Sequence, residues 1–229
     1  MPYNMSMKLI LISVAVVVVL VLIWALYGYF AVRDIERPRY SVLEKRDGYE
    51  IRKYDQYVVA ETTVSGDMRQ TMNEGFTRIA GYIFGGNTTK ASIAMTAPVG
   101  ERQGTSEKIA MTAPVSEKIA MTAPVVAGDE TNGARVISFV MPSKYTLETL
   151  PVPDDPRVKL RAVAGHTVAA LSFSWSSSPE TVTAKKLLLA SLLARDKVTV
   201  AGEPETAFYN PPWTPPFMLH TEILIPVSE

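Results

Sequence analysis

Hydrophobic and polar residues follow three successive patterns along the chain. An uncharged stretch, Leu9 to Val32, comes first, and from Tyr40 onward short segments alternate between apolar and polar positions, interrupted twice by stretches with helical spacing. The uncharged stretch exceeds the roughly 20 residues that a helix needs to cross a bilayer, and alternation predicts strands. We therefore expect a transmembrane anchor over residues 1–32, a juxtamembrane linker over 33–39 and one domain over 40–229.

The anchor has the features of a membrane-spanning helix. Its apolar region is longer and bulkier than that of a cleaved secretory signal, which ends at small residues, so we favour a span that is retained. Basic residues are more numerous after the span than before it, which favours a cytoplasmic domain, but interleaved acidic residues leave the periplasmic side open. Aromatic side chains suited to the membrane interface close the stretch: Trp24, Tyr27, Tyr29 and Phe30.

The first half of the domain predicts two strands and a helix. Tyr49 to Tyr54 and Val58 to Val64 are typical of a two-stranded hairpin. Asp67 followed by Gln70 resembles a helix start, and Gly85 with Gly86 ends the helix. Its apolar residues recur at helical spacing: Met68, Met72, Phe76, Ile79 and Ile83.

An internal repeat follows this helix. The decamer SEKIAMTAPV occurs at 106–115 and again at 116–125, and a degenerate copy occupies 90–99. Each copy is typical of a short strand that its proline confines to a sheet edge or a strand end. Because the two identical copies present the same side chains, either could occupy one position in the sheet.

The second half repeats the order of the first. After a buried strand, Arg135 to Met141, we expect a strand pair at 158–163 and 167–175 and then a helix capped by Ser178, with Pro179 at its first position. Further strands are expected at 197–200, 205–209 and 219–225. The pattern predicts an α+β fold of two similar halves facing each other, with a pocket in the cleft between them.

Charge and residue types exclude several classes of function. Lys plus Arg and Asp plus Glu both number 23, so no basic field would attract nucleic acid, and the absence of cysteine excludes thiolate chemistry. No nucleophile elbow or phosphate-binding loop is present, so we expect no enzyme. The two histidines, His166 and His220, are interpreted as a turn residue and a surface residue, with axial ligation of haem as the less favoured alternative.

What remains is an adaptable surface of methionines, aromatic rings and nearby basic residues, which suits flat polarizable ligands. Core packing is the competing interpretation for each methionine. The residues that we expect to line this surface are Met68, Arg69, Met72, Phe76, Ile79, Ile83, Met111, Met121, Tyr209, Trp213 and Phe217.

Several motifs, in order, resemble the SOUL haem-binding family: YEIRKY at 49–54, the IAMTAPV segments, FVMPSKYTLETLP at 139–151 and YNPPWTPPF at 209–217. The resemblance implies a distorted antiparallel β-barrel of two pseudo-symmetric halves with two amphipathic helices, similar to bacterial drug-sensing effector domains. It also implies non-covalent haem binding along the first helix of the domain without an axial ligand. This chain departs from the family's pattern where Asn73, Phe76, Ala80 and Gly81 precede Tyr82.

We therefore expect a membrane-anchored binding protein for haem or another hydrophobic tetrapyrrole, acting in haem trafficking or buffering. Its expected partners are membrane lipid, through residues 9–32, and the flat hydrophobic ligand itself. The alternative is a membrane-tethered domain that binds a protein partner or senses an amphipathic small molecule in its cleft.

Overall fold

The structure is a computed structural model of the whole chain, and it describes residues 3–33, 35–89, 93, 97–103, 134–211 and 213–228. Three α-helices are present in this part: α1 (Tyr3–Val32), α2 (Met68–Ile83) and α3 (Pro179–Arg195). A short 3-10 helix, η1, spans Pro216–Met218. The strands are β1 (Tyr40–Arg46), β2 (Tyr49–Tyr54), β3 (Tyr57–Ser65), β4 (Val99–Gln103), β5 (Ala134–Val140), β6 (Lys159–Val163), β7 (His166–Phe173), β8 (Glu205–Phe208) and β9 (Thr221–Pro226).

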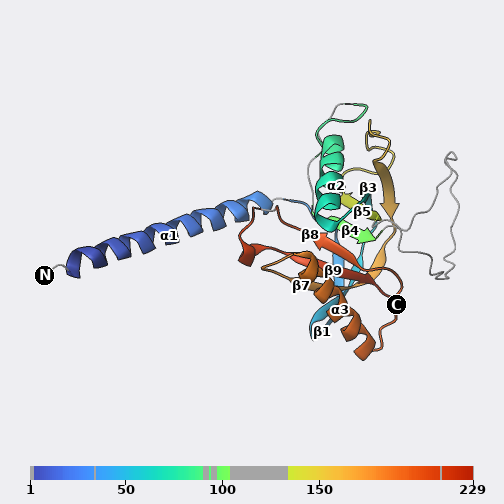
Figure 1. Cartoon of the computed structure of the whole chain (residues 1–229). Coiled ribbons are helices and arrows are strands. Elements are labelled where there is room, and N and C mark those ends of the chain that lie inside the picture. Colours follow the sequence, from blue (N-terminus) through green and yellow to red (C-terminus); the bar gives the residue numbers. More distant parts are fainter. Residues whose placement is uncertain are drawn as a thin grey trace.

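These strands form one antiparallel sheet in the order β1-β2-β7-β9-β8-β4-β5-β3-β6. The sheet curls into an open half-barrel, with β1 and β6 as its two edges. Helix α2 packs on β3 and β5, and α3 packs on β7 and β9 (Figure 1). The expected α+β fold of two halves with two helices after an apolar helix is confirmed.

Both halves place their helix on the same face of the sheet. Along β5, Ile137 and Phe139 pack in the core under α2, while Ser138 and Val140 face the other way. Along β9, Ile223 and Ile225 pack under α3 while Leu224 faces the other way. Strand alternation therefore puts the cores on the convex side and leaves the concave side to form the expected cleft.

The predicted strand pairs are wrong, although the strands themselves exist. β2 pairs with β7, and β3 pairs with β6, so neither 49–54 with 58–64 nor 158–163 with 167–175 forms a hairpin. Residues 55–56 link β2 to β3, and residues 164–165 link β6 to β7. At each of these corners the chain passes from one half of the sheet to the other. Tyr54 lies opposite His166, and Tyr57 lies opposite Val163. Each half thus supplies one bent strand to its counterpart.

The sequence interpretation also missed two strands and added one. β1 forms a hairpin with β2, and the Asp47-Gly48 pair between them, with Gly48 at a φ of 94°, was the available turn signal. β4 lies inside the sheet, between β8 and β5. Residues 197–200 form no strand, since only Val200 makes an isolated bridge, to Val227.

Local capping explains why both helices begin where predicted. The Asp67 side chain accepts a hydrogen bond from the backbone N–H of Gln70, and Ser178 accepts one from that of Thr181. Each cap satisfies one of the N–H groups that lack a partner within the helix.

Helix α1 extends away from the domain (Figure 1). Its segment Met7–Phe30 is long and apolar enough to cross a membrane, by length and composition. The two identical decamers, with Met111 and Met121, lie outside the described residues, and so does most of the degenerate copy.

Candidate ligand-binding sites

The concave side of the sheet contains a cleft of about 280 Å³ where the two halves meet. Its wall is aromatic at the corner of the bent strands, because the Tyr54 ring stacks on that of His166 with centroids 5.8 Å apart, and Tyr57 lies 6.0 Å from the same imidazole. Val59, Val140 and other apolar side chains complete the lining. This volume lies just below the roughly 300–1,000 Å³ typical of ligand sites.

Glu205, at the start of β8, points its carboxylate into this cleft. The carboxylate fits over β4 only because residue 100 is glycine, since a Cβ there would overlap Oε1 of Glu205. Burial raises the pKa of Glu205, and the positive charges of Arg102 and Arg161 oppose that shift. Those two guanidinium groups are paired with Glu61 instead, at 3.4 and 2.9 Å. The Glu205 side chain makes no hydrogen bond or ion pair with any described residue, so its carboxylate oxygens are available to a ligand.

Glu222 on β9 has the opposite environment. Arg52 donates to both of its carboxylate oxygens, at 2.9 and 3.0 Å, and the hydroxyls of Ser172 and Tyr209 donate at 2.7 Å each. His220 Nε2 lies 3.1 Å away. The side chain is almost fully buried, which by itself would raise its pKa, but these partners lower the pKa to about 2. With its oxygens satisfied, Glu222 is a structural residue that joins neighbouring strands.

A second cavity, a groove of about 570 Å³, runs beside α2 on the outer surface. Its helical side includes Asn73, Thr77 and Gly81, and its opposite bank is the loop carrying Asp155 and Arg157. A Cβ at Gly81 would meet nothing within 4 Å, so the missing side chain leaves open space at the groove floor. Arg157 is paired with Asp155 at 2.7 Å, but most of its side chain is exposed. The groove can therefore accept a flat group whose own carboxylates reach a guanidinium.

The structure separates the predicted lining residues on α2 into two sets. Ile79 and Ile83 are fully buried in the core between α2 and the sheet, so they offer no surface to a ligand. Met72 is partly buried against the same core, whereas Arg69 is exposed and Phe76 is 40% exposed, packing at 5.3 Å on Phe139. Placement of the Met68 side chain lies outside the described residues.

The predicted residues of the loop after β8 do not join α2. Tyr209 is buried and hydrogen-bonded to Glu222, while Trp213 and Phe217 are exposed near the end of α1. His166 lines the cleft, and His220 lies beside Glu222. The one surface expected from the sequence is thus divided among the α2 groove, the cleft and the end of α1.

Sequence reasoning did not select the residues that define the cleft. Glu205 and Tyr54 were assigned only to expected strands, and Tyr57 lies just before the expected strand at 58–64. The usable signal was alternation, since Tyr57 and Val59 lie on the face opposite the apolar residues Val58 and Ala60.

Comparisons with known proteins agree with this architecture. The model of the family described as SOUL heme-binding protein matches residues 35–226. The crystal structure of the EcmrR C-terminal domain superposes with a TM-score of 0.52 at 10% identity, covering 79% of this chain and 98% of that one. A structure described as a hydrolase from Listeria innocua superposes with a TM-score of 0.50 at 10% identity, covering 81% and 94%. No curated protein sequence matches the chain. At these identities the structural likenesses establish the fold alone.

Proposed function

Because this chain belongs to the SOUL heme-binding protein family, we propose that it is a membrane-anchored protein that binds haem or a related tetrapyrrole without covalent attachment, along α2. The family is one of binding proteins, and the proposal includes no catalytic step. The observation that carries the site is the groove beside α2, open at Gly81.

The residues around the groove fit a macrocycle held by its faces and its carboxylates. Thr77 and Gly81 offer a surface with little side-chain bulk. Arg157 on the far bank and Arg69 near the start of α2 are exposed cations that can pair with propionates. No histidine, cysteine or methionine is among the lining residues. Tyr82 lines the groove, but it is buried and its hydroxyl donates to the Pro151 carbonyl oxygen at 2.9 Å. The described lining therefore offers no free histidine, cysteine, methionine or tyrosine to haem iron.

This absence of an iron ligand in the groove lining gives the test. Purified full-length protein in mild detergent is titrated with haemin, followed by its Soret band, and with metal-free protoporphyrin IX, followed by fluorescence. We expect similar affinities for both, because the contacts do not involve iron. Arg157→Gln should weaken both equally. Failure to bind either compound would refute the function, and much tighter binding of haemin would refute the site.

The anchor part of the proposal rests on α1. With Met7–Phe30 across a bilayer, the domain would hold its ligand at the membrane surface, which suits a role in passing on or buffering a poorly soluble tetrapyrrole. Carbonate extraction of membranes from cells that produce the full chain checks this part, because a spanning protein stays in the pellet and a cleaved or peripheral one is released.

A second function, small-molecule sensing in the cleft, is favoured by one observation: Glu205 lies unpaired beside the aromatic wall of Tyr54, Tyr57 and His166. A carboxylate next to aromatic rings suits a small organic cation. Benzyltrimethylammonium binding, measured by calorimetry, should be lost in Glu205→Gln and kept in Gly81→Leu. Equal binding by Glu205→Gln would exclude the cleft as the site.

A further inference from the structure

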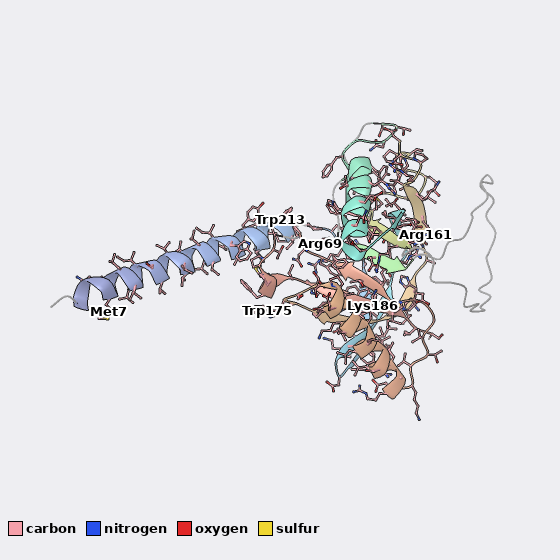
Figure 2. The ribbon with its side chains drawn as sticks, viewed as in Figure 1. Met7, Arg69, Arg161, Trp175, Lys186 and Trp213 are labelled. Atoms are coloured by element: carbon pink, nitrogen blue, oxygen red, sulfur yellow. The ribbon has the colours of Figure 1, made fainter. Side chains whose placement is uncertain are left out.

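All three tryptophans of the chain gather at the domain-proximal end of α1. Trp24 Nε1 donates a 2.8 Å hydrogen bond to the carbonyl oxygen of Trp213, and the backbone N–H of Trp175 donates to Pro216 at 2.9 Å. The Trp175 and Phe217 rings lie 6.3 Å apart. Figure 2 shows Trp175 and Trp213 on the side of the domain from which α1 leaves. Segments far apart in sequence therefore form one aromatic cluster, which we call the tryptophan cluster: Trp24, Trp175, Trp213 and Phe217.

The loop between β8 and β9, which carries Trp213, lies directly against α1 because the helix has a glycine at the contact. Gly28 is buried, and a Cβ at this position would lie 2.9 Å from Cδ of Pro215. Trp24 and Gly28 are one helical turn apart, so the same face of α1 makes both contacts. The 3-10 helix η1, which follows Pro215, also contacts α1, and Figure 1 shows η1 beside the domain-proximal end of α1.

This contact fixes the depth of the loop. Trp24 precedes Phe30, the end of the apolar segment, by six residues, which corresponds to about 9 Å along a helix. The apolar segment has 24 residues, somewhat more than the roughly 20 that fill the hydrocarbon layer. When such a segment is centred in a bilayer, each end reaches about 3 Å past the roughly 30 Å hydrocarbon layer, so Trp24 lies about 6 Å inside the domain-side edge of that layer. Trp213, bonded to it, must lie at that level too.

The chemistry of the loop suits this location. Residues 206–219 contain no charged side chain, and four of them are prolines, which have no N–H to desolvate. Three N–H groups of the loop bond within it: those of Thr214, Met218 and Leu219 donate to the carbonyl oxygens of Pro211, Pro215 and Pro216. Trp175 is 69% exposed and holds a φ of 76°, an unfavourable backbone conformation for a residue with a Cβ. Tryptophan is enriched at the membrane–water interface that adjoins this depth.

We propose that the tryptophan cluster inserts into the lipid at the domain-side edge of the hydrocarbon layer and seats the domain on the bilayer, so that the domain is fixed there and does not swing on a flexible tether. The residues after α1 support a fixed seat. The backbone N–H of Ala97 donates to the Glu36 carbonyl at 3.0 Å, and that of Asp55 donates to Arg39 at 3.0 Å. Ser143 N–H donates to the Glu36 carboxylate at 2.9 Å. This inference rests on the membrane anchoring in the proposed function, and it adds a second lipid contact within the domain.

The absence of cysteine allows a direct test with the full chain. Single nitroxide labels are attached to Phe217→Cys and, separately, to Trp175→Cys in phosphatidylcholine vesicles. Power saturation then compares collisions with oxygen, which concentrates in lipid, and with a water-soluble nickel complex. Val18→Cys on α1 gives the lipid reference, and Leu187→Cys, exposed on α3, gives the water reference.

We expect the labels at 217 and 175 to favour oxygen, as the label at 18 does, and the label at 187 to favour nickel. Labels at 217 and 175 that resemble the one at 187, while the label at 18 reports lipid, would overturn the seating and leave the anchor intact. Protection from both collision partners would mean that protein covers the cluster, which also overturns it. A water-exposed label at 18 would overturn the anchor, and the seating with it.

Discussion

The two halves of the domain place a helix on the same face of the sheet, yet they build that helix from different residues. Helix α3 consists mainly of Leu, Ala and Lys and contains no glycine. Helix α2 contains Gly75, Gly81, Asn73 and two threonines, and each glycine costs about 1 kcal/mol of helix stability relative to alanine. The second half thus has the helix of higher intrinsic stability, and the first half gives up helix stability for close packing on one side and an open groove on the other.

The largest expected effect on stability comes from breaking the buried ion pair between Glu222 and Arg52. Glu222→Gln removes the buried carboxylate that pairs with Arg52, which is only 6% exposed and keeps the less buried Glu50 as its remaining ion-pair partner among the described residues. Leaving one partner of a buried ion pair typically costs about 3–5 kcal/mol, and urea unfolding of the full chain in detergent, followed by circular dichroism, measures it. Glu205→Gln is the matched control on the neighbouring strand. It should cause little loss, because burial raises the pKa of Glu205 and its side chain has no hydrogen-bond or ion-pair partner among the described residues, so an amide of the same shape breaks no interaction. Equal losses of unfolding free energy in both variants would show that Glu222 and Glu205 do not differ in their contribution to stability.

Acid should weaken the same cluster. Glu222 has a folded-state pKa of about 2, below its ordinary value of 4.5, so its charge stabilises the fold above about pH 4.5. That contribution, about 3 kcal/mol, is lost as the pH falls from 4.5 toward 2. Unfolding free energies measured across this range should fall for the wild type, and the part of the slope due to residue 222 should be absent from Glu222→Gln. Identical pH slopes would refute the assignment.

The two glycines of α2 should respond in opposite directions to the same substitution. A Cβ at Gly75 would lie 2.5 Å from Cγ1 of the buried Ile137, whereas one at Gly81 would meet nothing within 4 Å. Gly75→Ala should therefore destabilise the domain by about 1–3 kcal/mol through overpacking. Gly81→Ala should stabilise it by about 0.5–1 kcal/mol through helix propensity. Thermal melts of both variants decide this, and a shift of the same sign in both would show that the two faces of α2 do not differ.

Sequence reasoning succeeded where the determining interactions are local. The α2 start was found because Asp67 caps a backbone N–H three residues away, and Ser178 does the same for α3. Strand pairing failed because the corner at 55–56 sends β3 away from β2, so each pairs with a strand more than 90 residues further along the chain. No local pattern encodes such a partner.

The candidate sites show the same division. Ile79 and Phe76 share the apolar periodicity of α2, but only the packed sheet decides that Ile79 is buried and Phe76 is half exposed. The fate of Glu222 depends on Arg52 and Ser172 from two other strands. The family resemblance points to α2 as the binding helix, which stays a prediction, while the groove beside it depends on the distant loop that carries Asp155 and Arg157.

The proposed function places a tetrapyrrole in the α2 groove over Gly81. The direct measurement is the affinity of full-length protein for protoporphyrin IX in Gly81→Leu and in Ala190→Leu, which places the same side chain at an exposed position of α3. We predict that Gly81→Leu loses about tenfold or more in affinity, about 1.4 kcal/mol, and that Ala190→Leu binds like the wild type. Unchanged affinity in Gly81→Leu, with the fold intact, would contradict the claim.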